Sequence, residues 1–158
     1  DQVRHITLVT LRTLGRRVQY LREETTAINR MLRPLIRATA PGLLEVYGIG
    51  FNTAAKLLVA VGDNPQRIRS EAAFAHLCGV APIPASSGKT IRHRLNRGGN
   101  RQANSALYHI VLTRMKHHQP TRDYVARRLK EGKTMGEIAR ILKRYVAREV
   151  FKHLPRPT

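Results

Sequence analysis

The first 39 residues carry an apolar pattern that fits a long helix. Seven apolar side chains and one threonine recur at alternating spacings of three and four positions: Leu11, Leu14, Val18, Leu21, Thr25, Ile28, Leu32 and Leu35. This spacing is the heptad repeat of a coiled coil, and so narrow an apolar seam needs a partner to cover it. We therefore expect residues 1–39 to form a coiled-coil dimerisation helix. The alternative is a helix that folds back on its own domain.

Residues 40–158 follow a break at Ala40-Pro41-Gly42 and predict a compact helical domain, so the expected fold class is all-α. Apolar stripes at helical spacing predict helices over residues 52–61, 70–77, 100–118, 121–131 and 134–150, the last opened by a Thr134–Glu137 capping box. The exception is residues 79–99, which are too long for an ordinary connection and contain two prolines and three further glycines after Gly79. We expect one long basic loop there, or a short hairpin.

Charge is the second constraint on the chain. It has 29 Lys and Arg against 10 Asp and Glu, a formal net charge of +19. Because a net charge of about 2 to 8 suffices for solubility, this excess indicates a polyanionic partner, most commonly nucleic acid. An anionic membrane surface is the competing partner. It would need a helix with bulky apolar residues opposite a basic face, and the chain has no Trp.

The charge is also placed unevenly, because all ten acidic residues lie outside positions 72–122. This window contains eight Lys and Arg residues, and we expect it to form one continuous positive surface in the folded domain. The alternative is a solvated basic face without a partner, although such faces usually mix charges of both signs.

Cysteine and apolar content exclude several classes of protein. Cys78 is the only cysteine, which rules out an intrachain disulfide and a cysteine-based zinc finger and favours a reducing cytoplasm. No apolar run approaches the roughly 18 residues that a membrane span needs. The histidines do not combine with carboxylates at metal-ligand spacing, so we expect no metal site. The chain starts at Asp1 rather than at a methionine, which suggests a piece of a longer protein.

Two glycines one residue apart, Gly48 and Gly50, precede the helix expected near Asn52. Such a turn can direct backbone amides outward, and the helix adds unpaired N–H groups and the positive end of its dipole. The pattern resembles the helix-hairpin-helix motif, which holds a phosphate without reading base identity. We therefore place Gly48, Gly50, Asn52 and Lys56 at a nucleic-acid contact. The alternative is a packing turn between two helices.

A second candidate region runs from Ala85 to Arg101. Gly88-Lys89-Thr90 is not a P-loop, because Ile83 stands where that motif needs a glycine. What remains is Ser86 and Ser87 beside Gly88, followed by the basic residues Lys89, Arg92, Arg94 and Arg97. An activated serine can attack phosphorus where cations offset the developing charge, but loop serines are more often only turn formers. Further on, Asn100 is a candidate N-cap with Arg101 beside it, which makes a second phosphate contact.

These pieces together identify a family. Residues 44–107 resemble the C-terminal domain of insertion-sequence transposases whose N-terminal domain is RuvC-like with a DEDD carboxylate set. The matching segments are Gly48-Ile49-Gly50 with Ala54 to Leu58, Phe74 to Pro82, Ser87-Gly88-Lys89, and Gly99-Asn100-Arg101. The heptad helix is similar to the coiled-coil connector of this family.

The resemblance implies a function and its residues. Ser87 corresponds to the serine nucleophile for DNA strand exchange, with Ser86 as the runner-up. Mg²⁺ would bind the DEDD domain, which this sequence lacks, so the chain would hold no cofactor and would be inactive alone. The implied partners are DNA, a guide RNA as in some members, and a second copy of the chain, in a nucleoid-associated cytoplasmic protein.

A non-catalytic binding module is the rival interpretation. A helix-hairpin-helix architectural protein would bind DNA or RNA without chemistry, and substitution of Ser87 would leave its behaviour unchanged.

Overall fold

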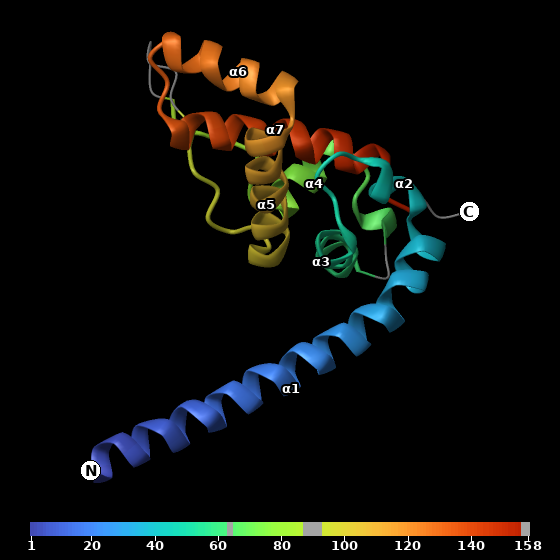
Figure 1. Cartoon of the computed structure of the whole chain (residues 1–158). Coiled ribbons are helices and arrows are strands. Elements are labelled where there is room, and N and C mark those ends of the chain that lie inside the picture. Colours follow the sequence, from blue (N-terminus) through green and yellow to red (C-terminus); the bar gives the residue numbers. More distant parts are fainter. Residues whose placement is uncertain (63–64, 87–92, 156–158) are drawn as a thin grey trace. The chain divides into compact units, whose positions relative to one another are not determined.

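A computed structural model describes residues 1–62, 65–86 and 93–155, and it is mostly helical (Figure 1). Within the described residues there are seven α-helices, one 3₁₀ turn at Pro65–Arg67 and one two-stranded hairpin. This confirms the all-α fold class, the long first helix and the short hairpin. The chain divides into two units, Asp1–Leu35 and Ile36–Thr158. No described helix has the length and apolar character needed to cross a membrane.

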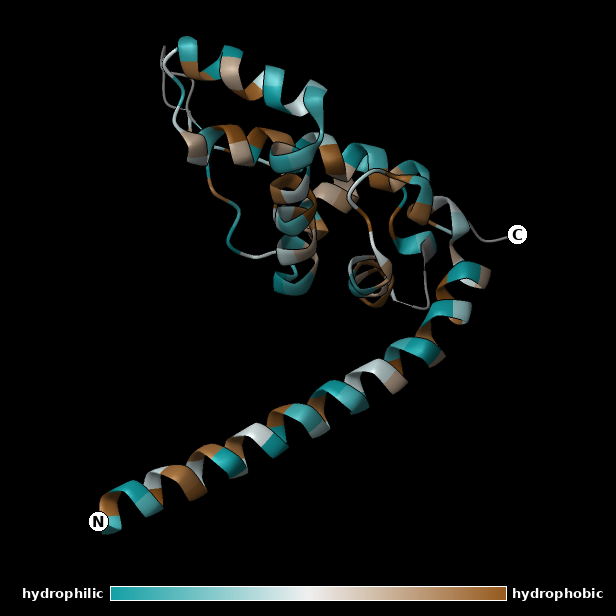
Figure 2. Cartoon of the chain, in the orientation of Figure 1, coloured by the Kyte–Doolittle hydropathy of each residue, from teal (hydrophilic) through white to brown (hydrophobic). Residues whose placement is uncertain are grey.

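Helix α1 (Gln2–Thr39) is continuous and supplies the whole first unit. Apolar and polar residues alternate along it (Figure 2). The side chains of the heptad seam are exposed in this unit, from 37% at Leu32 to 62% at Leu35. The predicted helix is therefore confirmed, and its seam has no cover from the first unit itself. The coiled-coil dimer remains a prediction.

The second unit is built around helix α5 (Arg101–His117), which packs against α3 (Phe51–Val61), α6 (Gln119–Lys130) and α7 (Met135–Lys152) (Figure 1). Helix α4 (Glu71–Leu77) packs against α7, and the short α2 (Pro41–Glu45) against α3. One stripe of α5 is fully buried or nearly so: Ala103, Ala106, Leu107, Ile110 and Val111. Strands β1 (Ile83–Pro84) and β2 (His93–Arg94) pair antiparallel, Ile83 opposite Arg94.

Local signals determine the helix ends. The side chains of Ser70 and Asn100 accept hydrogen bonds from the amides three residues on, at 3.1 and 3.0 Å. The capping box of α7 is complete, and the hydrogen bond from the Thr134 amide lowers the pKa of the Glu137 carboxyl. Gly79 ends α4 with a φ of 64°, a backbone conformation that glycine adopts without the steric cost of a Cβ.

Two differences from the predicted helices lie at prolines: the short helix α2 was not predicted, and α6 starts earlier than expected. The break after α1 is a single residue, because Pro41 already occupies the first turn of α2, a position that needs no amide donor. Helix α6 begins at Gln119, two residues before the predicted start, because His118 is extended and Pro120 again occupies the first turn.

The backbone just after α4 is in direct contact with the backbone just before α5. A Cβ placed on Gly99 would lie 2.2 Å from the Gly79 nitrogen and 2.9 Å from the Cys78 carbonyl carbon. The Asn100 amide donates to the Leu77 carbonyl at 2.6 Å across the same contact. Only glycine fits at position 99, so this residue sets where α5 starts against α4.

We predict that Gly99→Ala destabilises the second unit strongly, by about 3 kcal/mol or more, because a methyl group there must displace backbone rather than a flexible side chain. Gly98→Ala is the matched control. The nearest atom to its Cβ is Asn96 Oδ1 at 3.6 Å, an ordinary contact, so the change should be within about 1 kcal/mol. Urea denaturation followed by circular dichroism measures both. Equal midpoints for the two variants would contradict the prediction.

Candidate nucleic-acid interface

The first candidate contact is the turn Val46–Gly50 between α2 and α3. Gly48 has a φ of 87° and packs on α5, and the buried Ile49 anchors the turn. Gly50 is the N-cap of α3; it is exposed and has no side chain to accept from the first amides of the helix. Those amides therefore point to a place where an anion could bind. Helices α2 and α3 flank the turn, as the helix-hairpin-helix pattern requires, and its phosphate contact remains a prediction.

An arginine of α5 that is ion-paired to α7 holds this turn in place. The Arg114 Nε on α5 donates to the Tyr47 carbonyl at 2.8 Å, and its Nη1 donates to Glu149 of α7 at 2.8 Å. The Arg114 side chain is only 12% exposed. The Tyr47 ring lies against His118, with ring centroids 4.7 Å apart. Arg114 was counted in the predicted continuous positive surface, but the structure uses it to hold the turn.

Helix α3 adds polar and basic groups beside the turn. Asn52 is exposed, and Lys56 is half-buried one helical turn later on the same side. The guanidinium of Arg37, at the end of α1 but within the second unit, lies over the Phe51 ring at 5.2 Å from its centroid. Arg37 thus places a further positive charge near the start of α3.

The second candidate contact is the start of α5. Asn96 Oδ1 accepts from the Gly98 amide at 3.0 Å, which folds the segment that carries the exposed Arg97. A pocket of about 360 Å³ opens between Arg97 and Arg101 and extends to Tyr108. The predicted N-cap Asn100 is confirmed, although its side chain already accepts from Ala103. Arg97 and Arg101 are the cations that remain open to an anionic ligand here.

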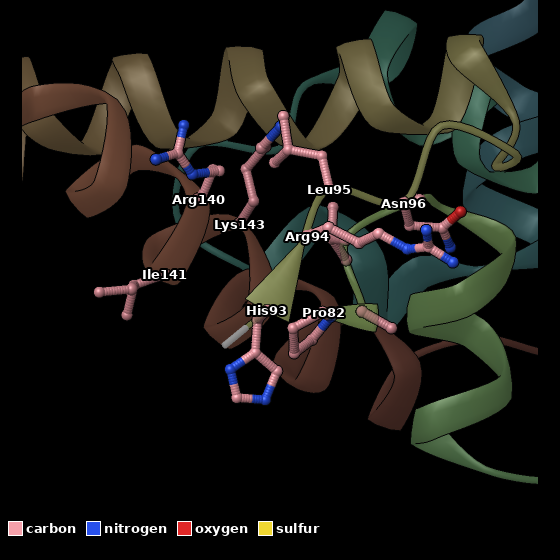
Figure 3. A pocket seen from close by; sticks show the side chains of 11 residues that line it. Pro82, His93, Arg94, Leu95, Asn96, Arg140, Ile141 and Lys143 are labelled. Atoms are coloured by element: carbon pink, nitrogen blue, oxygen red, sulfur yellow. The ribbon is translucent and has the colours of Figure 1, made fainter. Parts of the chain in front are cut away.

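A second pocket, of about 330 Å³, lies between the hairpin and α7 (Figure 3). Its lining includes four side chains that carry or can carry positive charge: His93, Arg94, Arg140 and Lys143. None of the lining residues is acidic. Arg94 was predicted from the sequence, whereas Arg140 and Lys143 come from a helix that we interpreted as core. The pocket is therefore an unbalanced positive site at the base of the hairpin.

Lys143 is held in place within this site. Its Nζ donates to Asn104 Oδ1 at 3.1 Å, and Asn104 Nδ2 donates to the Cys78 carbonyl at 2.8 Å. Burial, and then the nearby charge of Arg140, lower the pKa of the Lys143 ammonium. The negative charge of a bound phosphate would counteract this lowering, since it favours the charged form of the lysine.

Acidic side chains in the second unit are largely committed to structure. Glu71 pairs with Arg144 and with Arg148, which ties α4 to α7, and Glu149 pairs with Arg114. One acidic residue outside the basic window, Glu149, therefore folds back onto it, at Arg114. These two carboxylates are shared among Arg114, Arg144 and Arg148, whereas Arg94, Arg97, Arg101 and Arg140 have no ion pair in the part of the chain that the structure describes.

The predicted residues fall into two groups along α5. Gly48 lies beside its second half, since a Cβ built there would contact Ile110 and Arg114, and Gly50, Asn52 and Lys56 follow at the start of α3. Arg94, Arg97, Asn100 and Arg101 lie at its start. Ten residues separate Asn100 from Ile110, about 15 Å along the helix. A B-form duplex rises by that distance in about half a turn, so one DNA molecule could contact both groups.

The candidate nucleophile is adjacent to the second group in sequence. Ser87 and the candidate cations Lys89 and Arg92 lie outside the described residues. Ser86 is described, exposed, and two positions beyond β1. Pro82, just before β1, and His93 and Arg94 of β2 line the positive pocket. Among the described residues, no group of three or more His, Cys, Asp or Glu could hold a metal ion.

Comparison with known proteins gives two matches. The family model described as "Transposase IS116/IS110/IS902 family" matches residues 40–126, more than half of the chain. The chain is also similar to the insertion element IS110 uncharacterized 43.6 kDa protein of Streptomyces coelicolor, with 32% identity over 129 residues. That alignment covers 80% of this chain and 32% of the relative, so the chain spans about a third of the length of the curated relative it matches.

We predict that Arg114→Ala loosens the turn and lowers the stability of the second unit by about 1–3 kcal/mol, because the Tyr47 carbonyl and Glu149 both lose their donor. Hydrogen exchange at the amides of residues 47–50 should accelerate. The control is Arg127→Ala, which removes an exposed arginine whose nearest approach to Glu131 is 3.9 Å and should leave exchange at these amides unchanged. Unaltered exchange in Arg114→Ala would contradict the bracing role.

Proposed function

The chain belongs to the IS116/IS110/IS902 transposase family, and from this premise we propose that it is the part of the transposase that grips DNA and supplies a serine for strand exchange. The observation that carries the proposal is the acid-free pocket of Arg94, Arg140 and Lys143 at the base of the hairpin. A phosphodiester is the ligand that such a pocket suits, since guanidinium and ammonium groups bind phosphate oxygens directly.

The proposed chemistry is attack by the Ser87 oxygen on a DNA phosphorus. A new P–O bond joins serine to DNA while one bridging P–O bond of the phosphodiester breaks. The departing deoxyribose oxygen takes up a proton and leaves as a hydroxyl, and the serine proton passes to a base. A hydroxyl of a second strand then reverses the step and releases the serine. Arg94, Arg140 and Lys143 are proposed to stabilise the additional negative charge on the phosphoryl oxygens.

None of the residues that line the pocket is a carboxylate that could act as the base. The resemblance assigns carboxylates and Mg²⁺ to a RuvC-like domain, and we propose that this other domain completes the site. Our proposal for this chain is therefore limited to phosphate binding and the nucleophile. Structured RNA is a second proposed ligand, because its backbone presents the same phosphates to the same cations. Self-association through α1 is part of the proposal as well.

The binding half of the proposal predicts a steep salt dependence. If about six phosphates are contacted, the slope of log K against log salt concentration should be near −5 for duplex DNA. The double variant Arg94→Ala/Arg140→Ala should weaken binding to all sequences alike and flatten the slope by about 2. Fluorescence anisotropy at several salt concentrations, with duplex DNA and with structured RNA in parallel, measures this.

A charge-matched control separates local contact from general charge. Arg127→Ala/Lys130→Ala removes the same two charges from the exposed end of α6 and should leave the slope nearly unchanged. Equal losses in the two double variants would assign binding to net charge alone and count against the pocket.

The catalytic half is tested in the full-length transposase with donor and target DNA. Ser87→Ala should abolish the covalent protein–DNA adduct on a denaturing gel while leaving DNA affinity nearly intact, because one hydroxyl adds little beside so many charges. Ser86→Ala is the adjacent control and should still form adduct. Adduct in Ser87→Ala but not in Ser86→Ala would move the nucleophile by one residue. Adduct in both would leave only the non-catalytic binding module.

A further inference from the structure

We propose that α1 pairs with α1 of a second copy in antiparallel orientation, in the one register that places Val18 of each copy opposite Leu21 of the other. This inference rests on the self-association included in the proposed function and adds its direction and register. It derives from the exposed heptad seam of α1 and from the charges that border it.

The seam has the character of an uncovered interface. Six side chains form a continuous stripe along the part of α1 that is the first unit: Leu11, Leu14, Val18, Leu21, Thr25 and Ile28. The five apolar ones are each at least 44% exposed. Thr25 is the one polar member. Its Oγ1 donates to the Leu21 carbonyl of its own helix at 2.6 Å. Thr25 is therefore satisfied without a polar partner across the seam and does not require a second Thr25 opposite it.

A parallel pair would bring like charges together. The positions that border the seam include Arg17 and Glu24 on one side and Arg22 and Asn29 on the other. In a parallel coiled coil, the residue just before an a position, such as Arg17 before Val18, contacts the residue five positions further along the partner helix, on the other side of the seam. Arg17 of each copy would then face Arg22 of the other, twice per dimer, while Glu24 would face an uncharged asparagine.

The antiparallel pair reverses this balance. With Val18 opposite Leu21, Leu11 lies opposite Ile28 and Leu14 opposite Thr25. In this orientation the border that carries Arg17 and Glu24 lies beside the same border of the partner helix. Arg17 of each copy then lies beside Glu24 of the other, which gives two attractive pairs. Sliding by one heptad in either direction places Glu24 against Glu24 or Arg17 against Arg17. Charge complementarity therefore selects a single register.

A charge-swap series tests the orientation by sedimentation of the whole chain. The wild type should be a dimer at tens of micromolar, and Leu21→Arg/Ile28→Arg should be a monomer. Arg17→Glu and Glu24→Arg should each weaken the dimer about ten-fold, because two attractive contacts become repulsive. The double swap Arg17→Glu/Glu24→Arg should restore the wild-type dissociation constant. A tighter dimer in Arg17→Glu would instead reveal the parallel pair, since Arg22 would gain an opposite charge.

Disulfide trapping tests the register. Burial raises the pKa of Cys78 to about 12, so this thiol should not interfere under mild oxidation. Leu14→Cys and Thr25→Cys chains should each fail to form a disulfide dimer when oxidised separately, yet should cross-link when mixed. Cross-linking of either variant with itself overturns the antiparallel register, because only a parallel pair or another register brings identical positions together.

The two proposals fail separately. A wild-type chain that is monomeric in sedimentation but binds DNA with the expected salt slope would overturn the pairing of α1 and leave the nucleic-acid interface standing. A cross-linked dimer that binds no DNA would do the opposite.

Discussion

The arrangement of the second unit depends on one close backbone contact, between Gly79 at the end of α4 and Gly99 just before α5. Because neither residue has a Cβ, these two backbone segments approach closely enough for the Asn100 amide to donate to the Leu77 carbonyl. This contact holds the residues before and after the hairpin together. It therefore sets the position of the pocket that Arg94 shares with α7, and small residues rather than charged ones create the geometry of the site.

Buried and exposed arginines have different roles in the second unit. Arg114 is mostly buried, pairs with Glu149 and orders the Gly48 turn, whereas Arg97 and Arg101 border an open pocket. Few carboxylates are available, and those that pack between helices neutralise the arginines that the fold itself needs. The other arginines of the two pockets have no ion pair among the described residues, and we propose that they bind the ligand. The positive surface therefore consists of the basic residues that no structural ion pair uses. The net charge of the chain overstates how many such residues there are.

Much of the fold could be predicted from the sequence because its signals are local. Ser70 and Thr134 mark helix starts through bonds to amides three residues away, and the heptad seam spans a single helix. The contact of Arg114 with Glu149 joins residues 35 positions apart, and no local signal distinguishes that arginine from its neighbours. The sequence likewise contains no local signal that places Arg140 at the pocket. The apolar stripe of α7 identified its buried face, but only the tertiary structure shows that its other face closes the pocket.

The uninterrupted length of α1 has a consequence for the scale of the assembly. Its 38 residues extend about 57 Å, and in an antiparallel pair the chain leaves the two helices at opposite ends. The points of departure would be about 50 Å apart, equal to the rise of about 15 base pairs of B-form DNA. In the proposed antiparallel pair, inserting or deleting whole heptads in α1 would therefore change the distance between the two points of departure.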